Sequence, residues 1–441
     1  MPTLEILAIA MLASFFVLLM LGIPVGLTLA TTGFVFGWLG FGSLLFNLLP
    51  HRIFGVVTNT TLLAIPLFVF MGVMLEKSRL AEDLMDVIGH AAGRLRGGLG
   101  LGIILVGVLM GATTGIVGAT VVTLGLLTLP GMLRRGYDRG LACGVICASG
   151  TLGQIIPPSL ILILLADIMN TSVGTLFAAA MAPGLMLAGF YIAYVLLLGI
   201  VQPKMVPAVP KEERSLVSGR ELAGRLLRVV APPIGLVMAV LGSIVAGIAA
   251  PSEAASMGAL GSIAVAALGG RLSWSVLRET AQATTRITAM VMFILVCAQV
   301  FALAFRGLQG ERLVHDLFGL VPGGIDASIW FLMLLIFVLG FFIEWIEISY
   351  IAVPLFLPVF AAANVDMVWL ATLICMNLQT SFLTPPFGWS LFFLRGVAPP
   401  EVKTGDMYRG VIPFVLIQAI ALALVFLFPG LATWLPKAIG W

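Results

Sequence analysis

Long apolar stretches recur along almost the whole chain. Eight of them hold 17 residues or more, enough to approach the roughly 30 Å hydrocarbon core of a bilayer as a helix. They cover residues 4–22, 24–49, 53–75, 172–201, 229–249, 254–270, 280–305 and 411–435. Only 10% of the residues are charged, against about 25% in soluble domains. The sequence therefore predicts an all-α polytopic membrane protein, and the small net charge gives no support for nucleic-acid binding.

Two further apolar regions do not divide into simple spans. Residues 98–168 and 327–398 are interrupted by Gly, Thr and Pro, and each is too long for two ordinary helices. Irregular backbone at membrane depth occurs only where it is buried or lines a cavity. We therefore predict a re-entrant hairpin followed by a broken helix in each region. The hairpins are expected at 98–133 and 327–364, and the broken helices at 139–168 and 367–398.

The two halves of the chain share one alignment register. A shift of 228 residues superimposes Asp138 on Asp366, Leu129-Pro130 on Leu357-Pro358, and Pro157-Pro158 on Pro385-Pro386. Paired broken segments in two halves are typical of secondary transporters with internal repeats. We expect a first repeat at 1–201, a connecting loop at 202–228 and a second repeat at 229–441.

The basic residues predict the orientation of these repeats. If each hairpin enters and leaves on one side, five polar loops share a face: 76–97, 134–139, 202–228, 271–286 and 399–410. They carry 18 of the 23 Lys and Arg residues, so the positive-inside rule assigns them to the cytoplasm. Both termini are then periplasmic and the repeats are inverted. Residues 76–97 are expected to form an amphipathic interfacial helix, with an ordinary solvated loop as the alternative.

In the first half, small and hydroxylated residues gather at the expected hairpin tip and helix break. The tip is GATTGIVGATVVTLG (111–125) and the break is ASGTLGQIIPPS (148–159). Proline cannot donate a backbone hydrogen bond, so the break should free carbonyl oxygens, which together with hydroxyls suit Na⁺. The candidate residues are Thr113, Thr114, Gly115, Gly150, Thr151, Gly153 and Pro157. The alternative is a kinked helix that only packs.

The second half repeats this design with two carboxylates. Its tip is GFFIEWIEISY (340–350) and its break is NLQTSFLTPPFG (377–388). A carboxylate inside a membrane is costly and predicts a function, here close to Na⁺ or H⁺. The candidate residues are Glu344, Thr380, Ser381, Thr384 and Pro385. A capping or interfacial role is the alternative for Glu344, and for Glu347 the two readings are equally good.

Enzymatic signatures are absent from the sequence. There is no G-x-x-x-x-G-K-[ST] loop, no H-E-x-x-H and no G-x-S-x-G, so ATP hydrolysis by that loop and the usual hydrolase chemistry are not expected. We expect no enzymatic activity and no cofactor, with Na⁺ only as the coupling ion.

Four stretches also resemble a known family. They are LLAIPLFVFMG (62–72), 121–159, APSEAASMGAL (250–260) and FLTPPFGWSLF (382–392). They are similar to the large membrane subunit of tripartite ATP-independent periplasmic (TRAP) transporters, the DctM-like permeases. The resemblance covers nearly the whole chain. It implies a scaffold with a moving, elevator-type transport domain in the bacterial inner membrane. It also implies a small four-helix membrane subunit, expected here as a separate chain, and a periplasmic substrate-binding protein.

Residues and resemblance together predict import of a small organic acid, a carboxylate, driven by a Na⁺ gradient. The alternative among transporters is a stand-alone Na⁺-coupled anion transporter or a Na⁺/H⁺ exchanger of related architecture. From other classes, a channel or a non-transporting scaffold remains, although neither needs paired broken helices.

Overall fold

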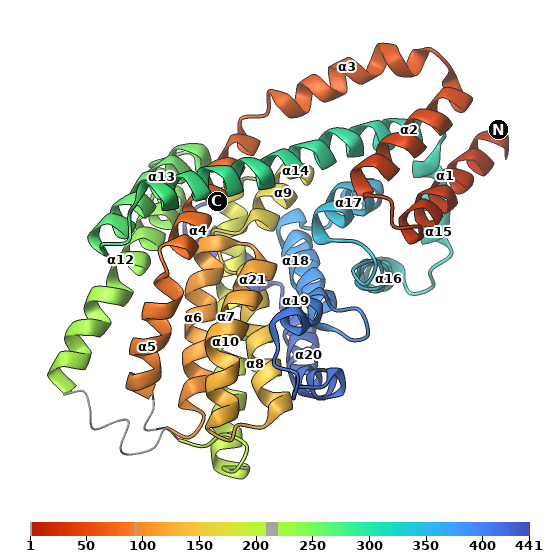
Figure 1. Ribbon diagram of the computed structural model, residues 1–441. Coiled ribbons are helices and arrows are strands. Elements are labelled where there is room, and N and C mark those ends of the chain that lie inside the picture. Colours follow the sequence, from red (N-terminus) through yellow and green to blue (C-terminus); the bar gives the residue numbers. More distant parts are fainter. Residues whose placement is uncertain (1, 93–94, 209–218) are drawn as a thin grey trace.

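The computed structural model describes residues 2–92, 95–208 and 219–441, and in these ranges all regular structure is helical (Figure 1). The first half contains α1 (Pro2–Met20), α2 (Val25–Phe41), α3 (Leu44–Val57), η1 (Thr61–Leu63), α4 (Ala64–Lys77), α5 (Leu80–Ala92), α6 (Gly98–Thr114), α7 (Val117–Arg134), α8 (Arg139–Thr151), η2 (Leu152–Gln154), α9 (Leu160–Ile168) and α10 (Val173–Val201). The second half contains α12 (Gly219–Val245), α13 (Pro251–Leu268), α14 (Trp274–Gly307), α15 (Gly310–Gly319), α16 (Gly324–Leu339), α17 (Trp345–Ala362), α18 (Met367–Leu383), α19 (Trp389–Val397), α20 (Thr404–Leu427) and α21 (Gly430–Ala438).

The helices of the second half repeat those of the first at the predicted offset. Adding 228 to the bounds of α7, 117 and 134, gives 345 and 362, which are the bounds of α17. The N-caps match as well, because Asp138 accepts a hydrogen bond from Leu141 N and Asp366 accepts one from Val368 N, both at 2.9 Å. The all-α repeat architecture is confirmed.

The equivalent helices α8 and α18 run in opposite directions. The start of α8 lies beside the start of α20, where Arg139 donates to the carbonyl of Glu401 at 3.2 Å. The start of α18 lies beside the other end of α20, where Trp369 Nε1 donates to Val425 O at 2.8 Å. Because both helices are compared with the same neighbour, the two repeats are inverted.

Helix lengths are consistent with a multi-pass membrane protein. Within the described ranges, six helices are long and apolar enough to cross a bilayer, or eight if two bent pairs are included. One pair is α3 with η1 and α4, bent by 52°, and the other is α15 with α16, bent by 119°.

The first bent pair differs from the predicted spans 24–49 and 53–75. Helix α2 ends at Phe41 because Gly42 takes a left-handed backbone conformation with φ +57°. The bend after α3 is polar, and there Asn59 accepts from Thr61 N at 2.9 Å and donates to the carboxylate of Asp167. A short polar segment that hydrogen-bonds to a neighbouring helix carries too weak a hydropathy signal to be located from composition.

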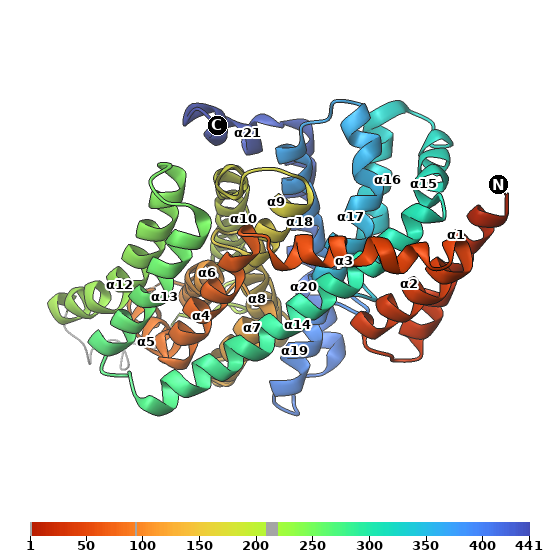
Figure 2. The ribbon, with the colours of Figure 1, turned by 90° about the horizontal axis from the view of Figure 1, so that it is seen from above.

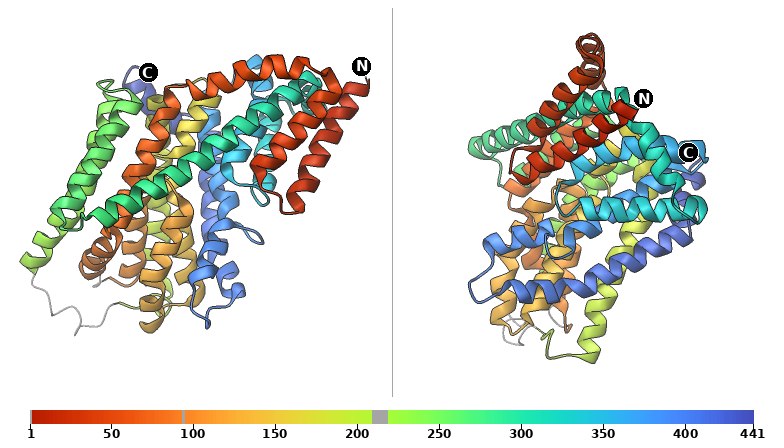
Figure 3. Two further views of the ribbon diagram at one scale, coloured as in Figure 1. Left: turned by 45° about the horizontal axis from the view of Figure 1, so that its top comes forward. Right: turned by 90° about the vertical axis from the view of Figure 1, so that its right-hand side faces the viewer.

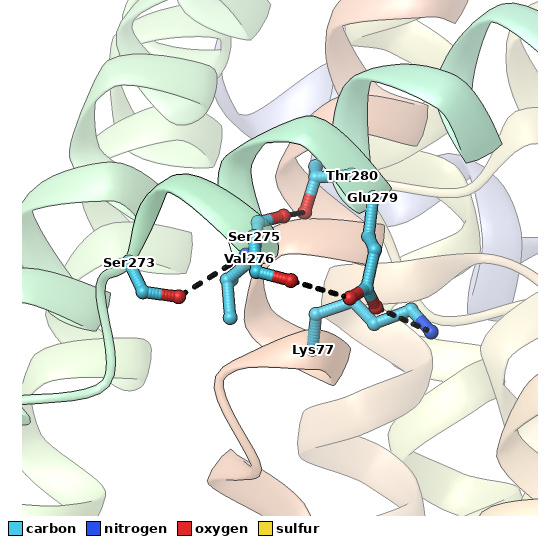
Figure 4. Close-up of polar contacts among 6 residues, drawn as sticks. All are labelled: Lys77, Ser273, Ser275, Val276, Glu279 and Thr280. Carbon is cyan, nitrogen blue, oxygen red and sulfur yellow. Dashed lines mark hydrogen bonds and ion pairs between the residues drawn. The ribbon is translucent and has the colours of Figure 1, made fainter.

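The long helix α14 crosses the molecule from the side of α12 and α13 to the side of α1 and α2 (Figures 2 and 3). Ser273 caps its start, and Glu279 pairs with Lys77 at the end of α4 over 3.7 Å (Figure 4). A second pair, Arg271 with Asp83 of α5, spans 3.3 Å. These contacts place the α4–α5 and α13–α14 loops side by side. This agrees with the prediction that both loops lie on the same face of the membrane.

Helix α5 occupies the middle of the segment expected to be an interfacial helix, 76–97. Its residues Ala81, Leu84 and Ile88 are buried, whereas Glu82 and Asp86 are exposed. Ile88 lies against Gly102 of α6. The apolar face of the amphipathic helix α5 therefore packs against other helices of the protein.

Candidate functional site

Both broken helices are interrupted at their Pro-Pro pairs. Helix α8 gives way to η2, and α9 begins only at Leu160. Helix α18 ends at Leu383 and α19 begins at Trp389. The bonds Pro157-Pro158 and Pro385-Pro386 are both cis. Residues 140–166, which include the first break, are all buried, whereas the second break follows the buried residues 370–383 and leaves Pro386 and Phe387 exposed.

At each break, a serine hydroxyl donates a hydrogen bond to one of the backbone carbonyls. Ser159 Oγ donates to Gln154 O at 2.6 Å, and Ser390 Oγ donates to Phe382 O at 2.9 Å. Gln154 O also lies 3.3 Å from Cys375 Sγ, which joins the first break to α18. The breaks therefore offer fewer free carbonyls than the prolines alone predict, because buried acceptors recruit nearby donors.

The tip of the first hairpin, α6–α7, reaches the first break. A Cβ placed on Gly153 would lie 2.7 Å from Gly111 Cα, so the two backbones are in direct contact. Gly115 then turns the chain with φ +60°, beside Leu160 at the start of α9. The tip thus stops where α9 begins, and the nine residues of α9 continue beyond it. That geometry is the one expected of a re-entrant hairpin.

The tip of the second hairpin, α16–α17, meets the second break in the same way. Asn377 Nδ2 donates to Met333 O at 2.7 Å. A Cβ on Gly340 would lie 2.6 Å from Ser381 Cβ. Each half therefore brings its own predicted tip and break residues together.

Most hydroxyls among the candidate residues donate to their own helix. Oγ of Thr151, Thr380, Ser381 and Thr384 lies 2.9, 2.9, 2.8 and 2.7 Å from the carbonyl three or four residues earlier. Their protons are committed, but their oxygen lone pairs can still ligate a cation. The side chains of Thr113 and Thr114 lie outside the described residues.

A cavity of about 420 Å³, here called the tip cavity, separates the two hairpin tips. The first tip contributes residues 115–119 and the second residues 344–346, while Met290 of α14, Leu160, Phe382 and Phe393 close the sides. Among its described lining residues, Glu344 is the only charged one. Glu344 is the N-cap residue of α17, and its side chain makes no cap hydrogen bond.

A second cavity of about 320 Å³, here called the carboxylate cavity, lies on the other side of Glu344. Glu344 and Met290 line both cavities, and Glu347 lines only this one. Glu347 is 4% exposed, and its Oε2 has no hydrogen-bond partner among the described residues. The sequence left Glu347 undecided. Its spacing of three residues from Glu344 was the available signal, because that spacing places both on one helix face.

A polar network that the sequence did not predict joins distant helices. Asp167, at the end of α9, accepts from Asn59 in the bend before α4 and from Tyr350 OH of α17 at 3.3 Å. These three residues connect the bent helix pair α3–α4, here called the bent arm, to the first broken helix and to the second hairpin.

Comparison with known proteins identifies relatives along nearly the whole chain. Residues 12–431 match the family described as "Tripartite ATP-independent periplasmic transporter, DctM component". The C4-dicarboxylate TRAP transporter large permease protein of Pseudomonas aeruginosa is 31% identical over 400 residues, covering 89% of this chain and 90% of that protein. The ectoine TRAP transporter large permease protein of Halomonas elongata is 28% identical, covering 96% and 98%. The sialic acid TRAP transporter large permease protein of Vibrio cholerae is 29% identical, covering 95% and 96%.

Among solved structures, the YdaH transporter of Alcanivorax borkumensis has a similar fold. Its TM-score is 0.59 at 15% identity, and the match covers 91% of this chain and 90% of that one. At this identity the likeness concerns the fold alone.

Proposed function

Because the chain belongs to the DctM family of TRAP transporter components, we propose that it imports a small organic acid, a carboxylate, using a Na⁺ gradient. It is a multi-pass membrane protein and not an enzyme. Its proposed location is the bacterial inner membrane. Its proposed partners are a separate small four-helix membrane subunit and a periplasmic substrate-binding protein, which supplies the substrate.

The observation that carries this proposal is the pair of hairpin tips, each seated on a helix break, with the tip cavity between them. Discontinuous helices near the middle of inverted repeats are where secondary transporters bind substrate and coupling ion. Half-helix N-termini such as those of α7 and α9 favour an anionic group. The three named relatives support the carboxylate class, because dicarboxylates, ectoine and sialic acid all bear a carboxylate.

Na⁺ coupling is supported by the oxygen atoms around each break. In the first half the candidate oxygen atoms belong to Gly115, Gly150, Thr151, Gly153 and Pro157. The second half adds Glu344, Thr380, Ser381, Thr384 and Pro385. Carbonyl, hydroxyl and carboxylate oxygens are the ligands of hard cations. The sequence has no phosphate-binding loop that would let ATP drive transport directly.

We also propose an elevator-type movement. The hairpins and broken helices would form the moving transport domain, because their backbones pack closely around the breaks. The remaining helices, including α14 and the bent arm α3–α4, would form the scaffold. The proposed repeats are 1–201 and 229–441 and the proposed cytoplasmic connection is 202–228, although α12 begins at Gly219, inside that expected connection. Residues 209–218 of that connection lie outside the described residues.

The test is uptake into proteoliposomes that contain the chain and its small subunit, with the binding protein and a radiolabelled carboxylate outside. An inward Na⁺ gradient should drive accumulation, and a positive-inside potential should slow it. Equal uptake with K⁺ in place of Na⁺ would refute the coupling. Na⁺-driven uptake without the binding protein would favour the stand-alone anion transporter instead.

A further inference from the structure

The carboxylate cavity has an unusual set of walls for a protein that moves anions. Its described lining residues include two carboxylates, Glu344 and Glu347, and no Lys, Arg or His. Most of the remaining wall is apolar, and Phe293, Phe342 and Trp389 contribute aromatic rings. An anionic group placed here would face two carboxylates and no positive side chain.

The side chain of Glu347 is buried and, among the described residues, lacks a hydrogen-bond partner for one of its oxygen atoms. It is 4% exposed, and Oε2 has no hydrogen-bond partner within the described part of the chain. A buried carboxylate oxygen without a partner is costly, and such a group is either neutralised by a proton or paired with a positive charge. The described ion pairs of the chain involve other residues. A cationic ligand would supply that positive charge at this position.

The shape and chemistry of the cavity favour an organic cation over a bare metal ion. An inorganic cation needs oxygen atoms on all sides, but here the carboxylates occupy one side and apolar or aromatic groups most of the other. An alkylated ammonium or an amidinium accepts both surroundings, because aromatic faces attract such cations. A volume of about 320 Å³ is also within the range of small-molecule sites.

We propose that the carboxylate cavity binds the positively charged group of the transported substrate, with Glu344 and Glu347 as its counter-charges. This inference rests on the proposed function, which supplies a carboxylate at the other end of the molecule. The substrate class is then a zwitterion, a small organic acid that also carries an ammonium, guanidinium or amidinium group. Glu344, shared by the two cavities, lies between the two ends.

The test measures binding to the purified full-length chain in an uncharged detergent at constant NaCl, without gradient or partner proteins. Three zwitterions are compared with analogues of similar shape that keep the carboxylate but lose the positive charge. The pairs are glycine betaine with 3,3-dimethylbutanoate, 4-aminobutanoate with pentanoate, and guanidinoacetate with ureidoacetate. Thermal stabilisation against ligand concentration gives an apparent affinity for wild type, Glu347→Gln and Glu347→Asp. Asp326→Asn removes an exposed carboxylate of the same hairpin and serves as the control.

At least one zwitterion should bind wild type at least tenfold more tightly than its uncharged-head analogue. Glu347→Gln should abolish that preference, whereas Glu347→Asp and Asp326→Asn should retain it. The proposal is overturned if no zwitterion is preferred, or if Glu347→Gln keeps the preference. Stabilisation by Na⁺ alone, lost in Glu347→Gln and unaffected by any zwitterion, would overturn it in favour of an inorganic ion site. Because no gradient is used, these outcomes do not depend on whether Na⁺ drives uptake.

Discussion

Replacing Gly153 with alanine tests the contact between the first hairpin and the first helix break. The new methyl group would lie 2.7 Å from Gly111 Cα and 3.2 Å from Gly111 O. Carbon atoms prefer separations of about 3.5–4.0 Å, so the two backbones must part by roughly 1 Å. Backbone atoms of packed helices cannot swing aside as the end of a flexible side chain can. Overpacking of this kind costs about 1–3 kcal/mol.

The same displacement should weaken cation binding at the first break. Sites of this type need their ligands held within about 0.5 Å, so a shift of roughly 1 Å should lower the apparent Na⁺ affinity by at least about tenfold. The assay is thermal unfolding of the purified chain, titrated with NaCl at constant ionic strength. The matched control is Gly189→Ala in α10, whose methyl group would meet none of the described atoms within 4 Å.

The control should be neutral or more stable by about 0.5–1 kcal/mol, because alanine favours a helix over glycine. If Gly153→Ala has the same unfolding free energy and the same apparent Na⁺ affinity as Gly189→Ala, the first hairpin does not pack against the first break as described.

Four further predictions concern other parts of the chain. Glu344→Gln should strongly lower uptake while expression and membrane insertion stay near normal, since it removes an ion- or substrate-facing charge; near-normal uptake would show that Glu344 has a structural role only. Thr384→Val should lower the apparent Na⁺ affinity in the same titration by about tenfold and stability by only about 1 kcal/mol, whereas an unchanged affinity would limit this hydroxyl to capping α18. Gly340→Ala should destabilise the second hairpin. Adding Ser381→Gly should restore at least about 1 kcal/mol of the unfolding free energy, because it removes the side-chain atoms that the new methyl group meets. Strictly additive effects of the two substitutions on the unfolding free energy would contradict the contact. A cysteine at exposed Lys204 should resist impermeant maleimide in intact cells and react in inverted vesicles, and labelling from outside would reverse the predicted orientation.

The breaks and the repeat register were accessible from sequence because they depend on proline. Pro157-Pro158 and Pro385-Pro386 cannot continue a helix, and one shift superimposes them, so both breaks and the α7–α17 equivalence could be predicted. Charge asymmetry supplied the inversion, which the positions of α8 and α18 beside α20 now show.

Other features depend on contacts that a linear pattern does not carry. Ser159 and Ser390 cap the carbonyls that the prolines release, and each bond depends on how the chain turns after its proline pair. The sequence left Glu347 evenly balanced between a functional role and a capping or interfacial one, and its burial and the missing partner of Oε2 are visible only in the structure. The tip cavity needs six separate stretches of the chain to meet, so its aromatic and aliphatic walls could not be anticipated from any one of them.

The Asn59–Asp167–Tyr350 network has no copy among the described residues of the other half of the molecule. Adding 228 to 59 gives Ile287, which has no polar side chain, and adding 228 to 167 gives Arg395, which donates to Val402 O instead. The segment equivalent to the bend between α3 and α4, at 286–291, runs unbroken through α14.

Inverted repeats are often used to derive the opposite end state of a transport cycle by exchanging the conformations of the two halves. Here that exchange would require α14 to bend without a polar partner and the first arm to straighten by giving up Asp167. In the proposed transport cycle, the inward-open and outward-open states would therefore not be related by a simple exchange of the two repeats. The free energy that separates these proposed states would then include the hydrogen bonds of the Asp167 carboxylate.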